Sequence, residues 1–130
     1  MAEAQGHFDV QIKPESTFAE GVGRFSVTKT FHGDLQGTAT GEMLAVRTPT
    51  PGSAGYVVIE RVEGSLAGKT GNFLLQHYGI LDRSQPEQKI AIIPDSGTGE
   101  LAGIAGHMSV AAAATHAYVL TYPLAMQPKE

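Results

Sequence analysis

The chain has 130 residues, of which 42% are hydrophobic and 17% are charged, with 16 Gly, 7 Pro and neither Cys nor Trp. A chain of this length can bury a core without metals or disulfides, so residues 1–130 are expected to form a single domain. The absence of Cys excludes a disulfide scaffold, a thiolate nucleophile and Cys-based metal sites. The net charge of −4 offers no basic field, so nucleic acid is not an expected partner.

The sequence shows no recognisable targeting or membrane-spanning segment. The opening residues MAEAQGHFDVQIKP lack a basic segment followed by an apolar one, and no apolar run has the length of a membrane helix. These observations predict a cytoplasmic protein without a membrane partner.

Apolar residues in the first half of the chain recur with period two and are interrupted by Gly, Pro and Asp, which is typical of consecutive β-strands. Pro14 is expected to end the first strand, and Gly37 and Gly41 indicate bends or bulges in the third. The first three expected strands cover residues 7–12, 24–31 and 35–48. In the second, one face is apolar (Phe25, Val27, Phe31) and the other carries hydroxyls (Ser26, Thr28, Thr30).

The second half of the chain continues this pattern. Three further strands are expected at 55–63, 71–81 and 88–93, and two more at 107–113 and 116–124. The connection at 94–106 is too rich in Gly for a stable helix, because each interior Gly costs about 1 kcal/mol relative to Ala. The alanine run at 111–114 would also suit a helix, and no Gly or Asn marks a hairpin turn there, but we favour strands.

Eight mostly antiparallel strands without a covering helix leave exposed sheet edges unless the sheet closes on itself. The sequence therefore predicts an all-β protein with an eight-stranded antiparallel β-barrel. The interior of such a barrel is either filled by side chains or just wide enough for one small ligand.

Two of the expected strands have apolar residues on both faces. In the strand 55–63, Tyr56 and Val58 lie on one face and Val57 and Ile59 on the other, and the strand 71–81 has a similar pattern. An outward apolar face without a covering helix suggests that another chain covers it, so we expect a homo-oligomer with these strands, and residues 90–93, at its interface. The alternative is that the termini or the 48–55 loop cover this face.

Two motifs resemble nucleotide-binding loops but fail on context. EGSLAGKT has Glu63 where a phosphate-binding loop needs Gly, and a strand-like segment follows instead of a helix. GTGELA matches a dinucleotide-binding pattern, but no parallel βαβ unit surrounds it. No cofactor is expected.

Metal ligation would depend on the five His residues and on carboxylates. The His residues show no helical i, i+4 pairing, and although barrel strands could bring His77 and His107 together, their spacing does not require it. No metal site is expected.

The remaining candidates are polar residues within the most apolar strands: Glu60 and Arg61 in VVIERVE, and Gln76 and His77 in FLLQHYG. Buried charges are costly unless they are paired. If the two strands form a hairpin, these residues form a cross-strand cluster that either fixes strand register or anchors a ligand in an apolar pocket. In the second case Glu60 is the general base or hydrogen-bond acceptor and His77 the acid or donor. The candidate ligand-binding residues are Tyr56, Glu60, Arg61, Gln76, His77 and Tyr78.

The run from FSVTKTFHGDLQGTATGEML through AGYVVIERVEGSLAGKTGNFLLQHYGILD to PDSGTGELAGIAGHMSV resembles a family of small bacterial proteins known as a domain of unknown function. The resemblance covers residues 7–123. That family is similar in fold to the allene oxide cyclase barrel, with the dirigent proteins as more distant relatives, so the resemblance implies an allene-oxide-cyclase-like β-barrel. The alanine run at 111–114 departs from the clear turn that family members have there.

The resemblance implies no activity, because the active-site residues of the cyclases do not map onto this sequence. We favour a protein that binds a small apolar ligand in or at the mouth of the barrel. One alternative is a cofactor-independent cyclase or isomerase acting on a lipid-like substrate. The other is a filled barrel with a structural or oligomeric role.

Overall fold

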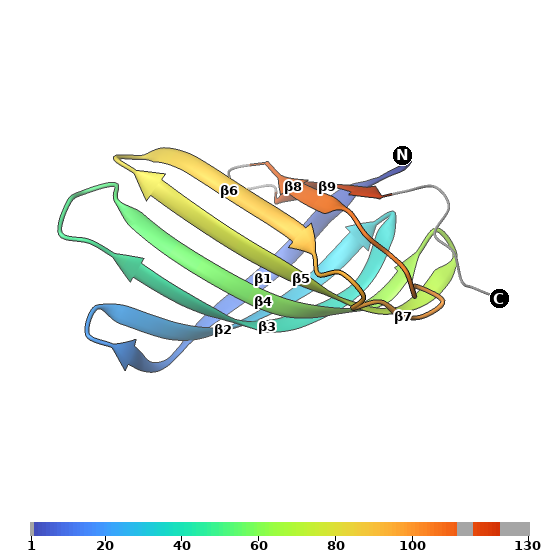
Figure 1. Cartoon of the computed structure of the whole chain (residues 1–130), viewed down its shortest axis with the longest axis horizontal. Helices are drawn as coiled ribbons and strands as arrows, with labels where there is room; N and C mark the ends of the chain where they lie inside the picture. Colours follow the sequence, from blue (N-terminus) through green and yellow to red (C-terminus); the bar gives the residue numbers. More distant parts are fainter. Residues whose placement is uncertain (1, 112–115, 123–130) are drawn as a thin grey trace.

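The computed structural model describes residues 2–111 and 116–122 and shows an antiparallel barrel (Figure 1). The sheet order β4-β3-β2-β1-β9-β8-β6-β5 is closed by pairing of β5 with β4, so eight strands form a ring. The predicted eight-stranded antiparallel barrel is confirmed. A two-residue strand, β7, adds to β5 outside this ring. The strands are β1 Ala2–Ala19, β2 Val22–Gly33, β3 Leu35–Arg47, β4 Ala54–Leu66, β5 Lys69–Asp82, β6 Gln85–Ile92, β7 Thr98–Gly99, β8 His107–Val110 and β9 Ala117–Tyr122.

The prediction that Pro14 ends the first strand is wrong, since β1 continues to Ala19. β9 pairs with β1 only as far as His7, so beyond that residue β1 has β2 as its one partner. Proline is tolerated on such a free edge because alternate N–H groups there have no ladder partner. A register shift between Pro14 and Ser16 accommodates the proline ring.

The prediction of bends or bulges at Gly37 and Gly41 is also wrong, because the register of β3 with both of its neighbours is continuous. Close approach of the strands explains Gly41 instead. A Cβ on Gly41 would lie 2.6 Å from the Cβ of Glu60 and 2.7 Å from its Cα. Glycine therefore leaves room on the inner face of β3 for the side chain of Glu60.

One end of the barrel is filled by apolar side chains. Leu35, Leu66 and Leu101 are at most 1% exposed, and Ile104 is 2% exposed. The last two belong to the Gly-rich connection, which is irregular as predicted apart from β7. The Tyr118 hydroxyl accepts a hydrogen bond from Leu35 N at 3.0 Å and so ties β9 to the start of β3. This end is a floor without room for a ligand.

The opposite end carries the hairpin turns β1–β2, β3–β4 and β5–β6 (Figure 1). The short strands β8 and β9 reach only part of the way along their neighbours, since β8 pairs with β6 at Ile90 and Ala91 alone. The strand expected from residue 116 is confirmed as β9, in which the alternate residues Tyr118, Leu120 and Tyr122 are buried. Predictions for residues 112–115 and 123–124 lie outside the described residues.

The outer face of β4 and β5 is apolar and open. Val57 is 51% exposed, Ile59 49% and Ile80 49%, and within residues 2–111 and 116–122 no segment covers them. Ile90 and Ile92 are 2% and 4% exposed because they point into the barrel, so their expected place at an oligomer interface is wrong. The homo-oligomer itself stays a prediction. In the part of the chain that the structure describes, no helix is long and apolar enough to cross a membrane.

Candidate ligand-binding site

Three charged or titratable side chains from different strands meet inside the barrel: Lys29 of β2, Glu60 of β4 and His77 of β5. The Glu60 carboxylate oxygen Oε2 accepts a hydrogen bond from Lys29 Nζ at 2.9 Å and contacts His77 Nε2. The side chain of Glu60 is fully buried, and those of Lys29 and His77 are 10% and 6% exposed. We call these residues the polar cluster.

Strand register brings the polar cluster together. On the inner face, Glu60 lies opposite Leu75 and Val58 lies opposite His77, so Glu60 and His77 are diagonal neighbours. Lys29 reaches Glu60 across β3, where the inward positions are the small residues Ala39 and Gly41. Small residues at these positions leave room for the lysine stem.

The electrostatics of the polar cluster favour an ionised carboxylate. Burial raises the pKa of the Glu60 carboxyl, but the contacts with His77 and the charge of Lys29 outweigh burial and lower this pKa below its ordinary value of 4.5. The Lys29 ammonium also lies 4.8 Å from the centroid of the Phe8 ring, in a cation–π contact.

The second carboxylate oxygen, Glu60 Oε1, is buried and has no hydrogen-bond partner among the described residues. An ionised oxygen can only accept hydrogen bonds, and burying it without a donor is unfavourable. Such unsatisfied buried groups are uncommon in native proteins and often mark a functional position. The polar cluster therefore has two buried atoms without a hydrogen-bond partner among the described residues, the acceptor Glu60 Oε1 and the ring nitrogen His77 Nε2.

A hollow of about 470 Å³ lies at the open end of the barrel, and we call it the mouth pocket. One wall is a row across three strands in which Tyr56, Gly79 and Gln88 lie opposite one another. A Cβ on Gly79 would come within 2.6 Å of the Tyr56 hydroxyl oxygen, so only glycine allows the ring to lie there. Gln88 Nε2 donates to this hydroxyl at 2.9 Å. The pocket is lined by Tyr56, Gly79, Ile80, Leu81, Pro86, Glu87, Gln88, Val110, Ala111 and His116.

The polar cluster lies just below the mouth pocket. His77 is the next inward-facing residue of β5 after Gly79, a step of about 7 Å along the strand. On β4, Val58 separates Tyr56 from Glu60 in the same inward column. The mouth pocket thus has an aromatic and aliphatic wall, as is typical of small-molecule sites, and the polar cluster lies one inward position deeper in the barrel, beyond the residues that line the pocket.

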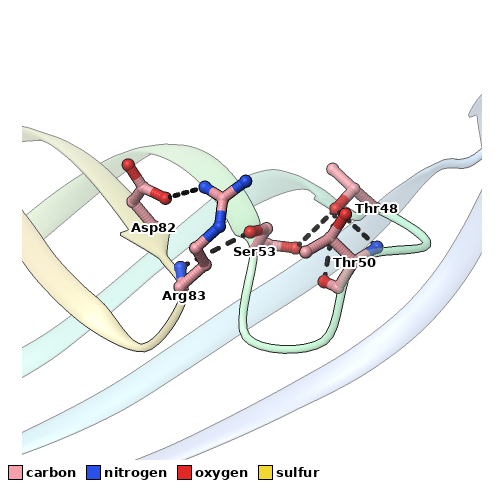
Figure 2. Close-up of polar contacts among 5 residues, drawn as sticks. All are labelled: Thr48, Thr50, Ser53, Asp82 and Arg83. Atoms are coloured by element: carbon pink, nitrogen blue, oxygen red, sulfur yellow. Dashed lines mark hydrogen bonds and ion pairs between the residues drawn. The ribbon is translucent and has the colours of Figure 1, made fainter.

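At the same end of the barrel, hydrogen bonds connect the β3–β4 and β5–β6 turns (Figure 2). Thr48 Oγ1 donates to the carbonyl of Ser53 at 3.2 Å within the β3–β4 turn. Arg83 N donates to Ser53 Oγ at 3.4 Å, and Ser84 N donates to Gly52 O at 2.8 Å, so the β5–β6 turn is tied to the β3–β4 turn. These contacts hold the two turns together beside Leu81, which also lines the mouth pocket.

Of the six residues predicted from sequence, the structure places Tyr56, Glu60 and His77 on the inner face. Arg61, Gln76 and Tyr78 point outwards, so their prediction as lining residues of the barrel is corrected. They alternate with inward residues, and each strand can present only every second side chain to the interior. The Arg61 side chain is 52% exposed beside Glu63, and the Tyr78 hydroxyl donates to Glu87 at 2.8 Å.

Sequence reasoning missed Lys29. Its position between Val27 and Phe31 on the apolar face of β2 predicts an inward charge, which needs a buried partner. A metal centre has no support in residues 2–111 and 116–122, where no group of three His or carboxylate residues could hold an ion. His77 is buried, whereas His107 is exposed, so the two do not form a pair.

A second hollow, of about 440 Å³, lies against β1, β2 and β3. It is lined mainly by outward polar residues that are exposed, including four threonines. The residues with unpartnered buried polar atoms, Glu60 and His77, do not line this hollow. Its lining residues are Asp9, Val10, Gln11, Thr28, Lys29, Thr30, Thr38, Ala39 and Thr40.

The fold and site define a small closed β-barrel with a filled floor, an open mouth and a buried ion-pair cluster between them. The chain belongs to the family described as "Protein of unknown function (DUF3224)", whose sequence pattern matches residues 4–122. It is similar to the crystal structure of a protein of unknown function from the DUF3224 family of Shewanella oneidensis MR-1. That similarity has a TM-score of 0.91 and 40% sequence identity over 99% of each chain. The comparison with curated proteins gives no match.

Proposed function

We propose that this protein binds a small, largely apolar molecule in the mouth pocket, with the polar cluster at the inner end of the site. The observation that carries the proposal is the fully buried carboxylate of Glu60 below the mouth pocket. A barrel that needed only a stable interior would be equally or more stable with apolar residues in place of a buried ion pair. Retaining Lys29, Glu60 and His77 there is more readily explained by recognition of a ligand.

The size and composition of the mouth pocket support the same function. A volume of about 470 Å³ is in the range of small-molecule sites. Tyr56 supplies an aromatic wall, and the hydrogen bond from Gln88 holds its hydroxyl in place, which reduces the ordering cost of binding.

A second candidate function is a cofactor-independent cyclase or isomerase, and the contact between Glu60 and His77 favours it. A carboxylate and an imidazole in contact can exchange a proton with a substrate held above them, with Glu60 as base and His77 as acid. We also propose that the barrel is of the allene-oxide-cyclase-like subtype, in which shape imposed on the substrate would contribute to the reaction. Turnover, rather than binding alone, would separate this candidate from a binding protein.

Native mass spectrometry of the protein purified from its host tests the proposed function. We expect a retained apolar compound in the wild type, released on denaturation. The matched variants are Glu60→Gln and Glu63→Gln, because Glu63 lies on the same strand but on the exposed outer face. Glu63→Gln should keep the compound and Glu60→Gln should lose it. An empty wild-type protein, or equal retention by both variants, would contradict the proposal.

A further inference from the structure

We propose that the ligand of the mouth pocket is a neutral molecule with an apolar body and one hydroxyl or N–H donor, and that this donor bonds to Glu60 Oε1. The inference rests on the proposed function and specifies the chemical class of the ligand.

The two oxygens of Glu60 have different partners, and this difference defines the missing group. Oε2 accepts a hydrogen bond from Lys29 Nζ and contacts His77 Nε2, although that ring nitrogen has no hydrogen-bond partner among the described residues. Oε1 is as deeply buried and has no donor among the described residues. The group that completes the site is therefore a donor, because a carboxylate oxygen accepts hydrogen bonds and gives none.

The net charge of the polar cluster argues against a charged head group. Lys29 already compensates the charge of Glu60 at 2.9 Å. An anionic head group would place a like charge beside Oε1 in a region of low dielectric, which is strongly unfavourable. A cationic head group would lose its hydration and would stand close to the Lys29 ammonium. A neutral hydroxyl or N–H group satisfies Oε1 without either cost.

The surroundings of the polar cluster define the rest of the ligand. Between Glu60 and the mouth, the inward positions of β4 are Val58 and Tyr56, and the next strand presents Gly79 above His77. These groups offer apolar contact and no further free charge. A ligand that reaches Glu60 from the mouth pocket must therefore pass apolar side chains, which suits an apolar body with a single polar end.

The test uses four probes of matched shape: 1-naphthalenemethanol, its methyl ether, 1-naphthoic acid and 1-naphthylmethylamine. At about pH 7 the acid is an anion and the amine a cation, whereas the alcohol and ether are neutral. The ether differs from the alcohol by lacking the donor, so this comparison needs no variant that could fail to fold. Isothermal titration calorimetry should show the alcohol binding at least about tenfold more tightly than each of the others, since hydrogen bonds to charged groups have this strength.

The variants Glu60→Gln and Glu63→Gln complete the experiment, with folding checked by circular dichroism. The preference for the alcohol over the ether should shrink to about threefold or less in Glu60→Gln and stay unchanged in Glu63→Gln. Equal binding of alcohol and ether by the wild type, or tightest binding of the acid or the amine, would overturn the inference. A retained natural compound without any O–H or N–H donor would overturn it while leaving the proposed function intact. Failure of all probes together with an empty native protein would overturn both.

Discussion

Replacement of Lys29 by Met tests whether the buried ion pair is as strongly coupled as its geometry indicates. Lys29 Nζ lies 2.9 Å from Glu60 Oε2, and the two side chains are 10% and 0% exposed. Removing one partner of a buried pair costs about 3–5 kcal/mol, because the other charge is left uncompensated. His77 still contacts the carboxylate and Met keeps the apolar stem, so we expect the lower end, about 3 kcal/mol. For a domain of this size that lowers Tm by about 10–15 °C.

The assay is urea unfolding at neutral pH, followed by circular dichroism, with the slope m compared between variants to verify two-state behaviour. Lys13→Met is the matched control, since Lys13 is an exposed lysine on β1 and should change the free energy of unfolding by at most about 0.5 kcal/mol. The double variant Lys29→Met with Glu60→Gln removes both charges. Its loss should be smaller than the sum of the two single losses, with a coupling of about 0.5–3 kcal/mol.

A Lys29→Met variant as stable as Lys13→Met would contradict strong coupling between Lys29 and Glu60, because the buried carboxylate would then not depend on Lys29. Strict additivity in the double variant would refute it independently, since two groups in contact should not act separately.

Three further predictions follow from the fold and site. Because the pKa of Glu60 is lowered in the folded state, the ionised carboxylate stabilises the fold fully above the ordinary pKa of 4.5, and this stabilisation is lost as pH falls through the folded pKa. The free energy of unfolding should therefore fall more steeply with acid in the wild type than in Glu60→Gln. Identical slopes in the two proteins would contradict this. Tyr118→Phe should lower the free energy of unfolding in urea by about 1–3 kcal/mol, because Leu35 N loses its buried acceptor. The control Tyr78→Phe, on the outer face, should lower it by at most about 0.5 kcal/mol. Equal losses would exclude a role for the buried hydroxyl. Light scattering at micromolar concentration should show a homo-oligomer for the wild type and a smaller species for Ile59→Lys, since Ile59 is half exposed on the open apolar face; a monomeric wild type would exclude this interface.

The barrel could be predicted because strand alternation and the need to remove exposed sheet edges leave few other solutions for a chain of this length in which no covering helix is expected. Residue-type signals such as Pro for a strand end and Gly for a bulge were less reliable, because contacts with neighbouring strands determine their effect. Pro14 has the sequence signal of a strand end, yet it lies on a free edge of β1 that tolerates it. Gly41 has the signal of a bulge, yet it provides space for Glu60 in a continuous ladder.

The candidate site was predicted only in part for a related reason. Glu60 and His77 were identified as polar residues in apolar strands, but so were Arg61 and Gln76, since strands with two apolar faces do not show which parity faces inwards. The structure resolves that ambiguity, because Glu60 and His77 are buried whereas Arg61 and Gln76 are exposed. Lys29 was missed because a single charge in a strand with one polar face is usually read as an outward residue, although its parity with Val27 indicates the interior.

The most direct test of the proposed site is a two-dimensional NMR titration of the wild-type protein with 1-naphthalenemethanol, in which amide chemical-shift changes show where the probe binds. If the ligand binds in the mouth pocket and reaches Glu60, the largest changes fall on two residues of the pocket and two of the polar cluster: Tyr56, Gly79, Glu60 and His77. Changes confined to the outer hollow around Thr28, Thr30, Thr38 and Thr40, or saturating binding that leaves Glu60 and His77 unaffected, would contradict it.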